Sequence, residues 1–289
     1  MTATSIRVAG VPEHFNLPWH LGRERGAFAR AGIDLQWRTV PQGTGAMCDM
    51  LRSGEVDLAV LVTEGAVRDL LTHGYGKIIA NYVDTPLVWG VHVGAGTEVH
   101  QRAQVKGLPF AISRPGSGSH LIAMSYAKAN GWTPTADDFV VVNDLKGAVE
   151  RMQAPDPLLF LWERTTTAPL VRNGTFRRVD EYRPAWPCFM VVAGNAALAE
   201  YGPLIDVLLR VLRDQAKGLM MKKDGAALVA ERQGLDPADA AEWFASVRWN
   251  TDGRVDARAL HTVADTLHAV GLLDRSFSLE EVQERLVRK

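Results

Sequence analysis

The chain has 289 residues, of which 47% are hydrophobic and 22% are charged, and its formal net charge is −1. This composition excludes an intrinsically disordered chain, and the balanced charge gives no reason to expect nucleic acid as a partner. Domains usually hold about 100 to 200 residues, so two lobes are expected. No apolar run approaches the roughly 20 residues of a membrane span, so membrane insertion is not expected.

The first ten residues, MTATSIRVAG, lead directly into a strand-like stretch. They lack the basic region, the apolar run and the cleavage site of an export signal. We therefore expect a cytoplasmic protein, or a periplasmic one if a leader has been trimmed. Cys48 and Cys188 have no metal-like spacing and are expected to be buried free thiols, although the sequence leaves their pairing open.

The first part of the chain alternates between strand-like and helix-like segments. Strands are expected at residues 6–11, 33–40, 56–62, 77–82 and 87–93, and helices at 18–31, 43–52 and 66–72. The apolar run at 56–62 is typical of a strand buried on both faces, and the alternation favours a parallel α/β sheet. We expect the first lobe to end at residue 93, before the polar stretch 94–104.

The same alternation restarts at Leu108. Strands are expected at 108–113, 139–142, 157–162 and 189–193, and helices at 117–130, 144–153 and 165–172. Residues 94–189 would form the second lobe, and residues 1–93 and 190–289 the first. From Asn195 onward we expect helices packed on the first lobe, with breaks near 202–203, 224–225, 236–237, 252–253 and 276.

The loops after the predicted strands supply the candidate ligand-binding residues, because ligands of open parallel sheets collect outside the carboxyl ends of the strands. These residues are His14, Phe15, Asn16, Gly43, Thr44, Gly45, Thr63, Glu64, Arg114, Ser117, Gly118, Ser119, His120, Trp162 and Glu163. They come from both predicted lobes, so we expect one cleft between the lobes.

Two of these loops, 43–45 and 114–120, are glycine-rich and enter helices. Small residues let a ligand oxygen approach the backbone N–H groups at the positive end of a helix. Arg114 would pair with an oxyanion, and the hydroxyls of Ser117 and Ser119 would either donate to it or only cap the helix. No Lys follows the glycines and the G-x-G-x-x-G pattern is incomplete, so no nucleotide cofactor is expected.

Glu64 and Glu163 follow apolar strands in opposite lobes. They would face the cleft and receive a cationic or hydroxyl group, or each would instead cap its following helix. Trp162 is the tryptophan best placed to stack on a ligand. Replacing Glu163 or Arg114 with alanine is expected to weaken ligand affinity with little loss of thermal stability. The remaining histidines lack metal-ligand spacing, so no metal is expected.

The segments G-T-G-A-M at 43–47, S-G-E-V-D-L-A-V at 53–60 and P-G-S-G-S-H at 115–120 carry a family resemblance. The chain resembles, over nearly its whole length, the substrate-binding proteins of the nitrate, sulfonate, taurine and thiamine-precursor uptake group. This resemblance implies a type II periplasmic-binding-protein fold, two-lobed α/β, which closes about a hinge on a small anionic or carboxylate-bearing organic ligand. It also implies delivery to an ABC permease, if the protein is exported.

An enzyme on the same fold is the alternative, for example a lyase or dehydratase such as the menaquinone-pathway chorismate dehydratase type. His14, Glu64, His120 and Glu163 would then serve as acid and base at one cleft. Neither a G-x-S-x-G nucleophile elbow nor an H-E-x-x-H zinc motif occurs. Binding is the favoured hypothesis, and both a monomer and a dimer remain open.

Overall fold

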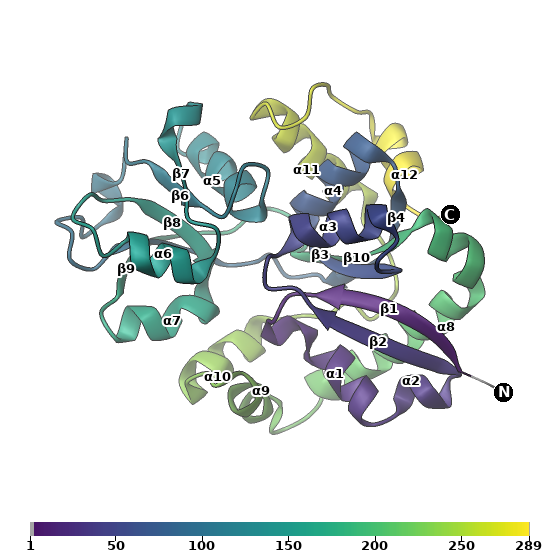
Figure 1. The fold of residues 1–289 in the computed structure, drawn as a ribbon. Coiled ribbons are helices and arrows are strands. Elements are labelled where there is room, and N and C mark those ends of the chain that lie inside the picture. The colour runs from purple at the N-terminus through teal and green to yellow at the C-terminus, as the bar shows by residue number, and fades with distance from the viewer. Residues whose placement is uncertain (1–2, 289) are drawn as a thin grey trace.

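The computed structural model describes residues 3–288 and forms two lobes, each built on one five-stranded sheet. Figure 1 shows the lobes side by side, with the elements of the second lobe on the left. This is the α/β two-lobed architecture that the sequence predicts. Both sheets are mixed, because each contains one strand that runs antiparallel to its two neighbours.

The first sheet has the strand order β2-β1-β3-β10-β4. Its strands are β1 (Thr4–Gly10), β2 (Ile33–Thr39), β3 (Leu58–Val62), β4 (Gly76–Val83) and β10 (Phe189–Gly194). β1 pairs in parallel with β2 and β3, whereas β10 runs antiparallel between β3 and β4. β3 is apolar throughout and its first four residues are buried, as expected for a central strand.

Helices connect these strands, and those that follow a strand begin at the carboxyl edge of the sheet, whereas the short second helix follows the first. They are α1 (Leu17–Glu24), α2 (Ala27–Arg30), α3 (Thr44–Ser53) and α4 (Thr63–His73). α3 ends at Gly54 and α4 at Gly74, both in the left-handed backbone region that glycine adopts without strain. The chain therefore turns back sharply into the next strand at each helix end.

The second sheet has the strand order β7-β6-β8-β5-β9. Its strands are β5 (Trp89–Gly94), β6 (Phe110–Ile112), β7 (Phe139–Val141), β8 (Leu159–Glu163) and β9 (Phe176–Tyr182). β5 runs antiparallel between β8 and β9. Our placement of the segment 87–93 in the first lobe is therefore wrong, and the chain crosses between the sheets before Trp89. The apolar pattern of the strand does not specify which sheet it joins.

The strand β9 was not predicted from the sequence. Its sequence, Phe-Arg-Arg-Val-Asp-Glu-Tyr, has one fully buried residue and alternates poorly, as is common at a sheet edge. The helices of this lobe are α5 (Gly118–Ala129), α6 (Leu145–Arg151) and α7 (Arg164–Arg172), with short 3-10 turns η2 (Arg102–Gln104) and η3 (Ala136–Asp138). Each of α5, α6 and α7 begins directly after a loop at the carboxyl edge of its sheet.

The C-terminal part is helical and comprises α8 (Asn195–Met220), α9 (Gly225–Gln233), α10 (Pro237–Ser246), α11 (Ala257–Ala269) and α12 (Leu279–Leu286). α8 continues through Pro203, so the predicted break at 202–203 is wrong. Burial of Ile205, Leu208 and Leu212 on the first lobe outweighs the one hydrogen bond that proline cannot donate. α8 packs on α1, and α11 and α12 pack on α4.

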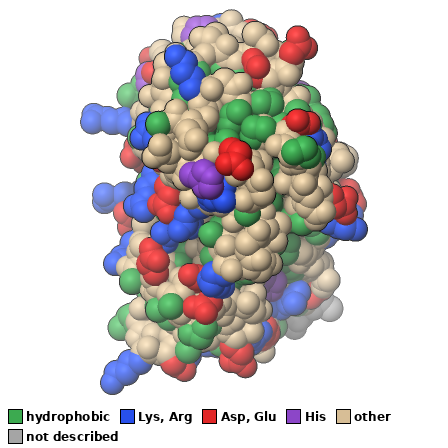
Figure 2. Space-filling model, turned by 90° about the vertical axis from the view of Figure 1, so that its left-hand side faces the viewer, with side chains coloured by type: hydrophobic (Ala, Val, Ile, Leu, Met, Phe, Trp, Pro, Cys, Tyr) green, Lys and Arg blue, Asp and Glu red, His purple; other side chains and the backbone are tan. Residues whose placement is uncertain are grey.

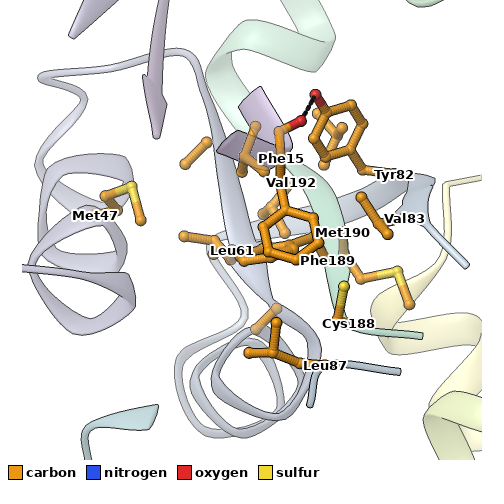
Figure 3. Close-up of a cluster of buried hydrophobic side chains, with 14 of the residues drawn as sticks. Phe15, Met47, Leu61, Tyr82, Val83, Leu87, Cys188, Phe189, Met190 and Val192 are labelled. Atoms are coloured by element: carbon orange, nitrogen blue, oxygen red, sulfur yellow. Dashed lines mark hydrogen bonds between the residues drawn. The ribbon is translucent and has the colours of Figure 1, made fainter. Parts of the chain in front are cut away.

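The first lobe is held by a cluster of buried apolar side chains around β3, β4 and β10, part of which Figure 3 shows. Phe15, in the 3-10 turn η1 (His14–Asn16), points into this cluster and its ring lies 5.0 Å from that of Phe189. The Tyr82 hydroxyl donates to the Phe15 carbonyl oxygen over 2.6 Å. Cys188 belongs to this cluster, and both it and Cys48 are buried free thiols.

The outer face of the second lobe carries charges of both signs. Figure 2 shows basic and acidic side chains intermixed there, with apolar side chains between them. This face therefore presents no extended area of one charge. Among residues 3–288, no helix combines the length and the apolarity that a bilayer crossing requires.

Candidate functional site

A cavity of about 310 Å³ lies between the two lobes, at the carboxyl ends of strands from both sheets. Its volume falls at the lower end of the range usual for small-molecule sites. The lining residues that the sequence predicted are Gly43, Thr44, Gly45, Arg114, Ser117, Gly118, Ser119, Trp162 and Glu163. The two glycine-rich loops thus face one cavity from opposite lobes.

The N-terminus of α5 forms one polar wall of this cavity. Ser117 caps the helix, because its Oγ accepts a hydrogen bond from the His120 amide. The Oγ atoms of Ser117 and Ser119 lie 3.0 Å apart, and Ser119 Oγ also accepts from the Ser113 amide over 2.9 Å. The first amides of a helix have no intrahelical acceptor, so those of Gly118 and Ser119 are donors at the cavity wall.

Arg114 reaches from the second lobe to the loop before α3. Its Nη1 atom donates to the Gln42 carbonyl oxygen over 3.1 Å. A Cβ atom built on Gly45 would lie 2.5 Å from Arg114 Nη2, so the guanidinium group rests on the glycine backbone. A larger residue at position 45 would therefore clash with the Arg114 guanidinium group. The positive charge of Arg114 lies beside the N-terminus of α3.

Glu163 lines the cavity but its oxygen atoms are already used. Oε1 accepts from the Thr165 amide over 3.0 Å, and Oε2 accepts from the Thr166 amide over 2.6 Å and from the Thr166 hydroxyl over 2.8 Å. Of the two roles that the sequence left open, Glu163 thus acts as the cap of α7. A charged group at a helix N-terminus also interacts favourably with the helix dipole.

Glu13 is a cavity residue that we did not select from the sequence, although it precedes His14 in the same loop. Glu13 lines the cavity, and among residues 3–288 no hydrogen bond or ion pair of its carboxylate is found. Burial, and secondarily the negative charge of Glu163, raise the pKa of Glu13 to about 8. Perturbed carboxyl groups of this kind are common in functional clefts.

His14, Phe15 and Asn16 do not line this cavity, because the chain turns inward at η1 and buries all three side chains. His14 stacks on Phe15 and meets the edge of Trp243, and Asn16 donates to the Val11 carbonyl oxygen. Strand alternation does not predict this, because a single 3-10 turn after β1 reverses the direction of the side chains.

Thr63, Glu64 and His120 also lie outside the cavity. Thr63 donates through its hydroxyl to the Pro187 carbonyl oxygen, and Glu64 accepts from Trp186 Nε1 over 3.0 Å. Burial raises the pKa of Glu64 to about 7. His120 accepts from the Gly116 amide through Nδ1. Ser119 lines the cavity whereas the next residue, His120, does not, a difference that loop position alone does not reveal.

Most residues of the apolar wall of the cavity were not predicted from the sequence. Leu87, Trp89 and Phe189 line it together with the predicted Trp162. Trp89 and Phe189 are the first residues of β5 and β10, the strands that follow the two crossings of the chain between the lobes. Asn143 also lines the cavity, with a positive φ of 67° that is unusual for a residue with a side chain. Asparagine adopts this conformation more readily than most residues.

Known protein structures share this two-lobed architecture. The Candida albicans CA3427 gene product, reported to define a new family with the generic periplasmic binding protein fold, aligns over 99% of this chain and 96% of that one, with TM-score 0.91 and 23% identity. The chain has the type II periplasmic-binding-protein fold. The family resemblance read from the sequence is therefore confirmed at the level of the fold.

Other proteins with this periplasmic-binding-protein fold include sulfonate binders. The alkanesulfonate-binding protein SsuA from Xanthomonas axonopodis pv. citri, bound to MOPS, aligns over 100% of both chains with TM-score 0.78 and 15% identity. The periplasmic aliphatic sulphonate binding protein SsuA from Escherichia coli aligns over 98% of this chain and 92% of that one, with TM-score 0.67 and 14% identity. No curated protein matches the sequence.

A family model described as Ca3427-like PBP matches residues 89–182. The match begins at the first residue of β5 and ends at the last residue of β9, so it spans the second sheet of the periplasmic-binding-protein fold. β5 is therefore part of the second lobe by strand pairing and by similarity. The cavity lies where open α/β sheets place their ligands, at the carboxyl ends of the strands.

Proposed function

We propose that the protein binds a small organic molecule with an oxyanion group, such as a sulfonate or carboxylate, in the cavity between its lobes. The α5 N-terminus supplies backbone donors and two hydroxyls, and α3 directs its own N-terminus to the same cavity from the opposite lobe. Helix N-termini favour negative charge through their free amides and dipole. The apolar wall would hold the carbon skeleton of the ligand.

The observation that carries this proposal is the position of Arg114. Its guanidinium group contacts Gln42 and Gly45 of the first lobe, although the residue belongs to the loop before α5 of the second lobe. A ligand oxyanion at this place would contact both lobes and one permanent positive charge. Arginine presents several N–H donors in a fixed plane, so one contact to Gln42 leaves others for the ligand.

The sulfonate-binding proteins of the same fold support an oxyanion ligand and suggest the cellular role. We propose that the protein is a substrate-binding component that closes on its ligand and delivers it to an ABC permease. Copurification of a permease complex with the tagged protein, dependent on ligand, is the expected result in cells that carry both genes. A ligand-loaded protein that captures no permease from such cells would contradict this role.

Binding is favoured over catalysis by the placement of the predicted acid and base residues. His14, Glu64 and His120 lie outside the cavity, and both oxygens of Glu163 cap α7. A general acid or base must come within hydrogen-bond reach of the reacting group. The enzyme alternative predicts turnover, so chemical change of a tightly bound compound during incubation under native conditions would favour the enzyme.

The direct test is native mass spectrometry of the freshly purified protein, followed by calorimetric titration. We expect a retained organic anion, or binding of propane-1-sulfonate or a related short sulfonate or carboxylate. Arg114→Ala should weaken binding of that anion by about tenfold or more, the amount typical of one charged hydrogen bond. Glu98→Gln, at an exposed position in the second lobe, is the control and should bind like the wild type.

A further inference from the structure

Among residues 3–288, three acidic residues line the cavity, Glu13, Asp144 and Glu163, and two of them have a structural role. Asp144 caps α6 by accepting from the Gly147 amide, and Glu163 caps α7. The Glu13 carboxylate has no such partner among the residues that the structure describes. A partly buried carboxyl group without a partner is costly unless it is protonated or a ligand supplies the missing donor.

Glu13 and the oxyanion donors of α5 come from opposite lobes. Glu13 follows β1 in the first lobe, whereas Ser117 and Ser119 stand at the start of α5 in the second lobe. Trp89, Trp162 and Phe189 supply apolar and aromatic surface to the same cavity. The lining thus offers hydrogen-bond donors for an anionic group of a ligand and a carboxylate that can accept from a donor group of the same ligand. The apolar surface can contact the carbon skeleton between these two groups.

We propose that the ligand is bipolar: an organic oxyanion that also carries a protonated nitrogen, which Glu13 receives. This inference rests on the proposed function, since it names the second end of a ligand whose first end is the oxyanion. A cation between the carboxylate and the aromatic wall would also gain from the faces of the rings. The protein would accordingly select amino-sulfonates or amino-carboxylates over the same acids without nitrogen.

Proton release follows from this arrangement. Burial and the nearby Glu163 raise the pKa of Glu13 to about 8, so the carboxyl group holds its proton at pH 7 when no cation is present. A bound cation favours the ionised form and expels that proton. The ionisable groups around Glu13 in the lining and behind it are Glu163, His14, Arg114, Asp144, Lys146 and Cys188.

The test uses matched pairs of compounds that differ by one amino group. The pairs are 3-aminopropane-1-sulfonate with propane-1-sulfonate, and 4-(aminomethyl)benzoate with 4-methylbenzoate. For at least one pair, the wild type should bind the amino compound about tenfold or more tightly. Glu13→Gln, which keeps the side-chain shape, should lose this preference and retain its affinity for the compound without nitrogen.

Calorimetry at pH 7 in two buffers of different ionisation enthalpy, neither a sulfonate nor a phosphate, measures the protons released. We expect release with the amino compound in the wild type and in Glu98→Gln, and none in Glu13→Gln. Equal binding of both members of each pair overturns the inference and leaves oxyanion binding intact. A preference that survives in Glu13→Gln overturns the role of Glu13. Binding of no member of either pair counts against the proposed function as well.

Discussion

His14 Nε2 lies 4.0 Å from Glu163 Oε2, and the two side chains come from opposite lobes. Both are nearly inaccessible to solvent. Burial lowers the pKa of His14, and the negative charge of Glu163 opposes this shift. His14 Nε2 has no hydrogen-bond partner among the described residues. The pair therefore forms a buried polar contact between the lobes next to the cavity.

Glu163→Ala is expected to lower stability, contrary to the expectation from the sequence. The substitution leaves the amides of Thr165 and Thr166 without their acceptor and removes the cap of α7. Loss of an N-cap costs about 0.5 to 2 kcal/mol, and the buried position places this case toward the upper end. Chemical unfolding at pH 7 measures the change. Glu163→Asp, which keeps an acceptor, should lose less, and equal losses would argue against the capping role.

Gly45→Ala is expected to weaken oxyanion binding without unfolding the protein. The new methyl group would approach within 2.5 Å of Arg114 Nη2, and a flexible guanidinium group moves aside at little cost. Arg114 would then leave its position beside the N-terminus of α3. Titration with propane-1-sulfonate should show a loss of several-fold, approaching that of Arg114→Ala. Gly96→Ala has open space around the new methyl group and is the matched control.

Glu64→Gln is expected to stabilise the protein at alkaline pH. Burial raises the pKa of Glu64 from 4.5 to about 7, so the folded state holds this proton more tightly than the unfolded state. Stability of the wild type therefore falls as pH rises from about 4.5 to 7. Glutamine carries no charge and its oxygen can still accept from Trp186. The variant should gain about 1 to 3 kcal/mol at pH 8, and the gain should vanish near pH 4.5.

The measurement is urea unfolding of both proteins from pH 4.5 to 8. Glu280→Gln, in the exposed first turn of α12, serves as control and should show no comparable pH-dependent gain. A stability difference between wild type and Glu64→Gln that is constant across this range would show that burial does not perturb Glu64.

Glu242→Gln is expected to weaken ligand binding by two- to fivefold. Arg164 of α7 in the second lobe pairs with Glu242 of α10 over 2.7 Å, and Arg172 of α7 pairs with Asp239 of α10. α10 is held to the first lobe through Trp243, which contacts His14 and Phe15. These ion pairs connect the two lobes when the lobes are close together. Each exposed ion pair contributes up to about 1 kcal/mol to the stability of that arrangement.

Removing one pair should favour an open arrangement, which small-angle X-ray scattering without ligand would detect as a larger radius of gyration. High salt should reduce the difference between the variant and the wild type, because exposed charges are screened. Arg38→Gln is the control, because it removes an exposed ion pair with Glu55 within the first lobe. Lys146→Gln would remove an exposed pair with Glu150 in the second lobe, but Lys146 also lines the cavity. Unchanged affinity and radius in Glu242→Gln would exclude a role in closure.

Much of the fold follows from the sequence, because local periodicity and turn residues specify strands and helices. The apolar run before Thr63 and the restart near Leu108 predict two α/β units without knowledge of their packing. The same reasoning finds the loops at 43–45 and 114–120, because strand ends of one sheet meet at one edge, although His120 lies outside the cavity. Ser117, Arg114 and Gly45 do line the cavity.

Which strand joins which sheet was decided by the tertiary structure. β5 is as apolar as its neighbours in sequence, and only its pairing with β8 and β9 places it in the second sheet. The direction of side chains within one loop was decided in the same way. Glu13 lines the cavity and His14 is buried against Trp243, because the turn η1 begins between them. The sequence determined which segments meet, and the packing determined which residues line the cavity between the lobes.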